Sequence, residues 1–125
     1  MRTAATIALF CAGGGLTRYY LSGWVHSLFG RAFPYGTFAV NIIGAYFIGL
    51  IMEMALQSTS ISGTLRLGLT VGFMGGLTTF STFSYETFKL LEDGQFAVAV
   101  ANILVSVVVC LLFTWLGIIT VRTMS

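Results

Sequence analysis

The chain has 125 residues, of which 57% are hydrophobic and only 8% are charged. Soluble domains carry roughly a quarter charged residues, so this composition excludes an ordinary soluble protein and indicates a membrane protein. The net charge of +2 is too small to indicate nucleic-acid binding, and none is expected.

Apolar residues gather in segments long enough to cross a bilayer, which takes about 20 residues of helix. These segments are 4–24, 36–56, 65–91 and 96–121, and the loops between them are short. We therefore predict an all-α membrane protein in which residues 1–125 form a single domain of four transmembrane helices.

The first segment, 4–24, ends in Tyr19, Tyr20 and Trp24, as expected for aromatic residues at a membrane interface. Arg18 lies just before them, and its position fits two interpretations equally well. It either helps to form an electropositive entrance to an ion pathway or extends its long side chain to the interface as an isolated charge.

The residues that could support metal or redox chemistry are few. Cys11 and Cys110 both lie within apolar segments, so we expect reduced side chains that pack like small hydrophobic residues. His26 has no second histidine, cysteine or acidic residue at metal-ligand spacing, so we expect a surface position for it.

The third segment, 65–91, contains Gly68, Gly72 and Gly76 at four-residue spacing, which makes a smooth face on a helix. In lipid, small residues at this spacing let two helix backbones approach closely. The face suits packing within the chain or at a subunit interface, and we predict a homodimer packed through this helix.

The stretch GGLTTFSTFS at 75–84 brings glycines and hydroxyl residues into the same segment. Gly75 and Gly76 have poor helix propensity, and Thr78 and Thr79 suit helix caps better than helix interiors. We predict that the helix breaks here, and broken helices at membrane depth commonly present free carbonyls and amides to ions. The alternative is a glycine kink whose hydroxyl groups bond back to their own backbone.

Phe80 and Phe83 follow the predicted break three residues apart. A helix that resumes near Thr79 places both rings on one face, beside hydroxyl groups. The edge of a phenyl ring is positive, so rings turned edge-on into a passage favour an anion without a full charge. The alternative is ordinary apolar packing of the two rings.

Lysine and arginine are balanced between the two ends of the predicted helices. One end receives Arg2, Arg66 and Arg122, and the other receives Arg18, Arg31 and Lys89. Because an excess of Lys and Arg in cytoplasmic loops normally sets orientation, this balance predicts insertion in both directions. The alternative is a weak bias, because placing Arg18 inside the first helix breaks the tie.

Three stretches together resemble a known family. They are GGGLTRYYL at 13–21, GTFAVNIIGAYFIG at 36–49 and GFMGGLTTFSTFSYE at 72–86. Their order, the chain length and the number of segments resemble the Fluc (CrcB) family of microbial fluoride channels over the whole chain. The resemblance implies an antiparallel, dual-topology homodimer with two separate fluoride pores and a structural sodium ion at the centre of the interface.

The resemblance also implies roles for individual residues. Backbone carbonyls of Gly75 and Thr78 from each subunit would hold the sodium ion, because they match the family's ligands at the break in the third helix. The ring edges of Phe80 and Phe83 would face the permeating fluoride. Asn41 matches the pore asparagine of the second helix.

Further matches extend the expected ion pathway. Thr37 matches a threonine near the start of the second helix, Glu86 matches an acidic residue near the pore, and Thr82 belongs to the cluster of hydroxyl donors after the break. On the fourth segment, a polar stripe with four-residue spacing looks like the family's polar track. This stripe consists of Asn102, Ser106 and Cys110. The family commonly has a hydroxyl near the Cys110 position, and a thiol is a weaker donor.

These expectations describe a channel, not an enzyme, that lets fluoride leave the cell passively across the cytoplasmic membrane and so protects the cell from fluoride toxicity. The sequence contains no phosphate loop, no nucleophile with a neighbouring base and no paired carboxylates. The alternative is a small dual-topology multidrug or cation transporter. That class calls for a membrane-embedded acid, usually in the first helix, and segment 4–24 has none.

Overall fold

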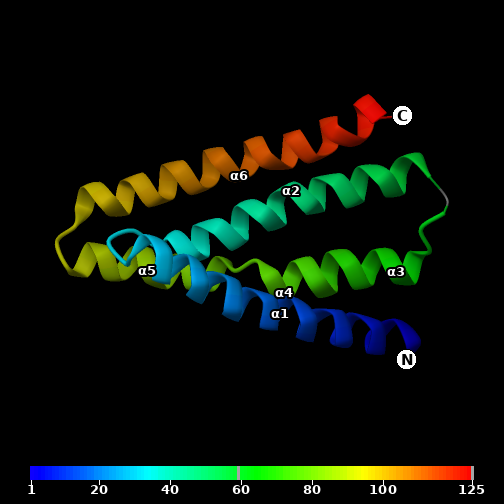
Figure 1. The fold of residues 1–125 in the computed structure, drawn as a ribbon, viewed down its shortest axis with the longest axis horizontal. Helices are drawn as coiled ribbons and strands as arrows, with labels where there is room; N and C mark the ends of the chain where they lie inside the picture. The colour runs from blue at the N-terminus through cyan, green and yellow to red at the C-terminus, as the bar shows by residue number, and fades with distance from the viewer. Residues whose placement is uncertain (59, 125) are drawn as a thin grey trace.

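The computed structural model describes residues 1–58 and 60–124, and these residues form an elongated helical bundle (Figure 1). The helices are α1 (Arg2–Phe29), α2 (Tyr35–Gln57), α3 (Gly63–Leu67), η1 (Gly68–Met74), α4 (Gly75–Leu77), α5 (Phe80–Glu92) and α6 (Phe96–Met124). Within the described residues, the prediction of four helical segments with a broken third segment is confirmed. The element η1 is a stretch of π-helix that continues directly from α3 and into α4.

Glycine residues allow the turns at one end of the bundle. Gly30 follows α1 with a φ of 86°, and Gly94 follows α5 with a φ of 77°. Residues with a Cβ atom rarely adopt this left-handed region, so glycine is the residue that ends these helices without strain. The chain therefore reverses direction after α1 and again before α6.

The break in the third segment lies at Thr78 and Thr79, which are both extended. Their φ/ψ angles are −89°/158° and −153°/115°. Gly75 and Gly76, where the sequence predicted the break to begin, still belong to α4. Gly76 is helical because it packs against α1, where a Cβ atom would lie 2.5 Å from the carbonyl oxygen of Cys11.

Among the described residues, α2 and α6 are the helices that are both long and apolar enough to cross a membrane by themselves. The apolar run of α1 is diluted by its glycines and Arg18, and the third segment is divided among shorter elements. Both nevertheless lie alongside the other helices in the bundle (Figure 1). Large apolar side chains such as Leu104, Val108 and Leu111 are exposed on α6, which is the surface expected against lipid.

The course of the helices separates most of the cationic residues into two groups. Both termini lie at the same end of the bundle, as does α3 (Figure 1). Arg2 at the start of α1, Arg66 in α3 and Arg122 near the end of α6 therefore share that end. Arg31, which follows α1, and Lys89, near the end of α5, lie toward the opposite end, whereas Arg18 lies inside α1, the placement that breaks the tie.

Helix packing pairs α2 with α6, and α1 with η1 and α4. Close approach of α2 and α6 depends on glycines on both sides, because a Cβ atom at Gly49 would meet the carbonyl oxygen of Thr114, and one at Gly117 would meet the carbonyl oxygen of Tyr46. Tyr46 and Thr120 also share a hydrogen bond between their hydroxyl groups at 3.0 Å. Close packing of this kind and interhelical hydrogen bonds both contribute to helix association in lipid.

The glycine face of the third segment is covered by α1 of the same chain. A Cβ atom at Gly72 would lie 2.8 Å from the Cβ atom of Phe10 and 2.9 Å from the carbonyl oxygen of Ile7. Gly68 and Gly76 approach α1 in the same way. Of the two uses that the spacing allowed, the structure shows packing within the chain, so this glycine face does not provide the predicted subunit contact, and a homodimer contact through another face of the third helix stays a prediction.

Replacing Gly72 with leucine is therefore expected to unfold the subunit rather than release an intact monomer. The added side chain would force α1 away from η1, because it meets backbone as well as side-chain atoms. Size-exclusion chromatography in detergent should show loss of the folded peak. The control is Gly23→Leu on α1, where a Cβ atom meets nothing within 4 Å. A well-folded monomeric Gly72→Leu protein would contradict this assignment.

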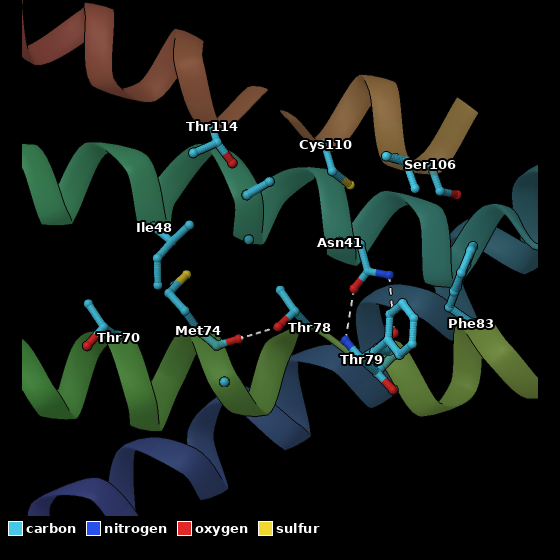
Figure 2. Close-up of a pocket in the computed structure, with 15 residues that line it drawn as sticks. Asn41, Ile48, Thr70, Met74, Thr78, Thr79, Phe83, Ser106, Cys110 and Thr114 are labelled. Carbon is cyan, nitrogen blue, oxygen red and sulfur yellow. Dashed lines mark hydrogen bonds between the residues drawn. The ribbon is translucent and has the colours of Figure 1, made fainter. Parts of the chain in front are cut away.

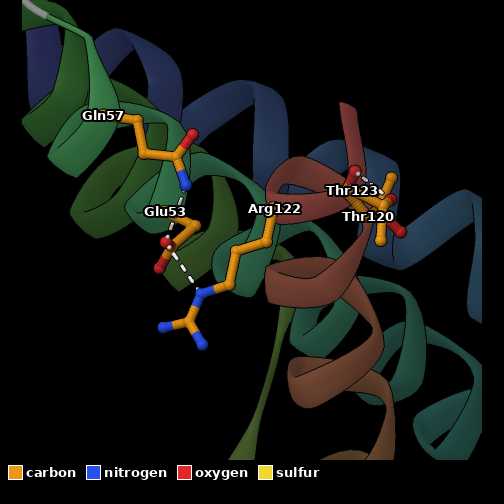
Figure 3. A network of polar contacts seen from close by, with 5 residues as sticks. All are labelled: Glu53, Gln57, Thr120, Arg122 and Thr123. Atoms are coloured by element: carbon orange, nitrogen blue, oxygen red, sulfur yellow. Dashed lines mark hydrogen bonds and ion pairs between the residues drawn. The ribbon is translucent and has the colours of Figure 1, made fainter. Parts of the chain in front are cut away.

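An ion pair joins α2 and α6 near the end that carries the termini (Figure 3). The Nε atom of Arg122 donates to Oε2 of Glu53 at 3.0 Å, and Gln57 Nε2 donates to the same oxygen at 3.1 Å. Glu53 is buried, with 7% of its surface exposed. A buried carboxylate is costly without a partner, so the ion pair with Arg122 makes this position of Glu53 tolerable.

His26 is partly buried, which corrects the expectation of a surface position. Its ring packs against α2, and a Cβ atom at Gly36 would lie 2.7 Å from the ring atoms Cδ2 and Nε2. Its Nδ1 atom is buried and has no hydrogen-bond partner among the described residues. The single glycine at the start of α2 leaves the space that the ring fills.

Candidate functional site

The break between α4 and α5 is held by the side-chain amide of Asn41 on α2 (Figure 2). The backbone N–H of Thr79 donates to Oδ1 of Asn41 at 2.8 Å, and Nδ2 of Asn41 donates to the carbonyl oxygen of Thr79 at 3.2 Å. One side chain therefore satisfies both backbone groups of an extended residue that has no helical partners. The second N–H bond of this amide remains available for another acceptor.

The hydroxyl of Thr79 caps the helix that follows. Its Oγ1 atom accepts from the backbone N–H of Thr82 at 3.1 Å and donates to the Thr82 hydroxyl at 3.0 Å. The Ser81 hydroxyl lies 3.3 Å away. This N-cap starts α5 and places Phe80 and Phe83 in its first turn.

A pocket of about 410 Å³ lies beside the break (Figure 2). It brings together residues from α2, η1, α4, α5 and α6 that are distant in the sequence. The predicted residues that line it are Asn41, Gly75, Thr78, Phe80, Phe83, Ser106 and Cys110. Most of its remaining wall is apolar, so the pocket presents hydrogen-bond donors and acceptors within an apolar lining.

The two phenylalanines lie next to each other at one end of this pocket. Their ring centroids are 5.4 Å apart and the ring planes are inclined by 40°. Phe83 is buried, whereas 78% of the surface of Phe80 is exposed. The pair is therefore only half enclosed by one chain, and Phe80 projects beyond it.

A second pocket of about 240 Å³ lies between α1, α2 and the start of α5. It gathers the predicted residues Arg18, Thr37 and Thr82. Thr79 lines both pockets, so both cavities border the break. The larger pocket holds the predicted rings and amide, and the smaller one holds the predicted cation.

Asn102 lies behind the larger pocket instead of lining it, which differs from the predicted stripe. It is only 1% exposed, and its Nδ2 atom donates to the Thr87 hydroxyl at 2.8 Å. Thr87 in turn donates to the carbonyl oxygen of Phe83 at 2.7 Å, and Ser106 donates to Oδ1 of Asn102 at 3.2 Å. Asn102 therefore connects the pocket residue Ser106 to α5.

Glu86 lines neither pocket. It is partly buried, and its Oε1 atom has no hydrogen-bond partner among the described residues. The predicted proximity to an ion pathway is therefore limited to its place one turn after Phe83 on α5.

Several hydroxyl residues at the site were not among the predicted pathway residues. Thr79 and Thr87 form hydrogen bonds that fix the break and α5, and Thr70 and Thr114 line the larger pocket. A sequence signal existed for Thr114, because it continues the four-residue spacing of Ser106 and Cys110 on α6. The role of Thr87 depends on a contact with another helix and had no such signal.

Comparison with known proteins identifies relatives of the whole chain. Residues 5–118 match the family described as CrcB-like protein, Camphor Resistance (CrcB). A protein of Trichlorobacter lovleyi named fluoride-specific ion channel FluC is 79% identical over 125 residues, which is 100% of both chains. Proteins of the same name from Pelobacter propionicus and Geotalea uraniireducens are 77% and 67% identical over 124 residues, covering 99% of this chain and 96% and 100% of theirs. The chain therefore belongs to the CrcB family.

Proposed function

We propose that this protein is a fluoride-specific ion channel that lets fluoride leave the cell passively and so limits its toxicity. The observation that carries the proposal is full-length identity of 79% to a relative named as such a channel. The larger pocket supports it, because it collects the amide, hydroxyl and ring groups that suit a small anion.

The chemistry of the larger pocket fits a strongly hydrated anion. Fluoride must exchange its water for close donors, and the free N–H bond of Asn41 and the positive ring edges of Phe80 and Phe83 are neutral groups of this kind. Neutral donors hold the ion weakly enough to release it, which conduction requires. The Ser106 hydroxyl donates to Asn102, so it reaches fluoride only after rotating its proton toward the pocket.

The smaller pocket suits the capture of an anion before it passes the break. Arg18 supplies a positive charge there, and Thr37 and Thr82 supply hydroxyl groups. An anion held near Arg18 would have Thr79 as the next residue common to both cavities. Arg18 would raise the local fluoride concentration without lying at the rings themselves.

The backbone at the break fits a sodium ion held by the carbonyl oxygens of Gly75 and Thr78. In a continuous helix these oxygens would accept from the amides of Thr79 and Thr82. Those amides donate instead to Asn41 and to the Thr79 hydroxyl. Carbonyl oxygens without helical donors suit a hard cation, which would serve as a structural link at the centre of a dimer.

We further propose that two copies assemble antiparallel in the cytoplasmic membrane. The small difference in Lys and Arg between the bundle ends, with Arg18 inside α1, supports insertion in both directions. The exposed ring of Phe80 also supports a second copy, because a partner would enclose it. The subunits would meet through a surface other than the glycine face that α1 covers.

Flux into and out of liposomes tests the proposed activity. Purified protein reconstituted into vesicles loaded with fluoride should release it when a potassium ionophore supplies the balancing current, and vesicles loaded with chloride should not empty. A fluoride-selective electrode measures the release of fluoride, and a chloride-selective electrode measures the release of chloride. Protein-free vesicles are the control, and an absence of fluoride release from folded, reconstituted protein would contradict the proposal.

Charge added to one end of the chain should bias the direction of insertion. Three lysines appended after Ser125 are expected to favour one orientation and to reduce fluoride flux, because antiparallel pairs become rare. Accessibility of a single engineered cysteine to an impermeant reagent measures the orientation. Three glutamines at the same place are the control, and unchanged mixed insertion would contradict the charge-balance argument.

Modification of Cys110 should block conduction from within the larger pocket. Cys110 is partly buried and lines that pocket, whereas Cys11 is exposed on α1. In a Cys11→Ala background, a small methanethiosulfonate reagent is expected to reduce flux by about tenfold or more, a barrier increase of about 1.4 kcal/mol. The Cys11→Ala, Cys110→Ser double variant is the control, and full flux after complete labelling would remove Cys110 from the pathway.

A further inference from the structure

We propose that Asn41 and Thr79 are positioning residues for the cation site. Their side-chain oxygens accept hydrogen bonds from two backbone N–H groups that, in a continuous helix, would donate to the carbonyl oxygens of that site. The inference rests on the sodium site of the proposed function. It assigns the availability of the Gly75 and Thr78 oxygens to named side chains on two different elements.

The first amide belongs to Thr79 itself. In an uninterrupted helix its N–H would donate to the carbonyl oxygen of Gly75, four residues earlier. It donates instead to Oδ1 of Asn41 at 2.8 Å, and the same side chain returns a bond to the Thr79 carbonyl. Asn41 lies on α2, so the Gly75 oxygen is freed by a contact between two helices.

The second amide belongs to Thr82. Its helical acceptor would be the carbonyl oxygen of Thr78, but the N–H donates to Oγ1 of Thr79 at 3.1 Å. The extended backbone of Thr79 places that oxygen at the N-cap of α5. Thr79 thus donates its own backbone N–H to Asn41 and accepts the backbone N–H of Thr82 with its side chain.

The two amides held by side chains are those whose helical acceptors would be the proposed sodium ligands, the carbonyl oxygens of Gly75 and Thr78. Among the carbonyl oxygens that lose their helical donors at the break, those of Gly75 and Thr78 belong to residues that line the larger pocket, whereas Gly76 and Leu77 do not line it. Thr79 is 8% exposed, so water competes little for these two hydrogen bonds. Removing the Thr79 hydroxyl would let the Thr82 amide turn to the Thr78 oxygen and extend the helix backward.

The test measures sodium binding through stability. A ligand that binds the folded protein raises its melting temperature with concentration. Purified protein in detergent is titrated with sodium chloride, with N-methylglucamine chloride keeping the ionic strength constant. For Thr79→Val, which keeps the branched shape without the hydroxyl, the sodium concentration that gives half of the stabilisation should rise about tenfold, as expected for a lost N-cap bond.

Matched variants separate positioning from a general loss of stability. Thr79→Ser keeps the capping hydroxyl and should restore the parental sodium midpoint, and Ser81→Ala, which removes the hydroxyl 3.3 Å away, should leave it unchanged. Asn41→Leu should raise the midpoint as well. If the valine variant does not purify as a folded protein, Thr79→Ala, which removes the same hydroxyl, replaces it.

Each outcome decides a separate point. A parental midpoint in both Thr79→Val and Asn41→Leu would overturn the inference while leaving the sodium site in place. A parental protein whose melting temperature ignores sodium would overturn the site and the inference together. Fluoride release from the same preparation would still decide the channel function independently.

Discussion

Replacing Phe83 with isoleucine is expected to lower fluoride flux by about tenfold or more while the protein remains folded. The substitution keeps an apolar side chain in a buried position, at a stability cost of about 1.5 kcal/mol or less if the site repacks. It removes the positive ring edge from the larger pocket, together with the contact to Phe80 at a centroid distance of 5.4 Å. A tenfold loss corresponds to a barrier increase of about 1.4 kcal/mol.

The measurement is fluoride release from liposomes, alongside the elution profile of the purified protein. Phe88→Ile is the matched control, because Phe88 lies on the same helix and is 60% exposed. It should conduct at the parental rate. A Phe83→Ile protein that elutes normally and also conducts at the parental rate would show that the two rings only pack against each other.

Replacing Asn41 with leucine is expected to abolish most of the flux and to lower the melting temperature at the same time. The change removes a donor from the larger pocket and both hydrogen bonds to Thr79. A buried amide left without a partner costs about 1–3 kcal/mol. The double effect distinguishes Asn41 from Phe83, whose replacement should reduce flux with little loss of stability.

Thermal unfolding in detergent and liposome flux together measure this effect. Phe47→Leu provides the control on α2, since its side chain is 42% exposed and lines neither pocket. Normal stability with lost flux would leave Asn41 as a pore donor alone. Normal flux with normal stability would contradict both of its assigned roles.

Local sequence chemistry predicted the helices and the break well. Continuous apolar runs identified α2 and α6, and threonines with a strong capping preference identified the point where the third segment opens. The same chemistry placed the start of the break too early. Poor helix propensity marked Gly75 and Gly76, but close packing of Gly76 on α1 keeps that turn helical.

Features that depend on which helices meet could not be read from the sequence. Spacing showed that Gly68, Gly72 and Gly76 share a face, but it does not say what covers the face. The same limit applies to the pair of Glu53 and Arg122, which are 69 residues apart, and to the hydrogen bond that buries Asn102 against Thr87. Periodicity assigns side chains to faces, and tertiary packing then decides which faces become cavity walls.

The pairing of helices has a consequence for how the chain assembles as it is synthesised. The principal partner of α1 is the stretch formed by η1 and α4, and that of α2 is α6. These partnerships interleave along the sequence, so the first half of the chain contains neither complete pair. A hairpin of α1 and α2 that leaves the ribosome has its close-packing surfaces still open to lipid.

Completion of the bundle must therefore wait for the last helix. Until α6 enters the bilayer, the surface around Gly49 on α2 lacks the backbone that fills it, and the buried carboxylate of Glu53 lacks the guanidinium of Arg122. A chain shortened before α6 would expose an unpaired acid and an uncovered glycine face to lipid.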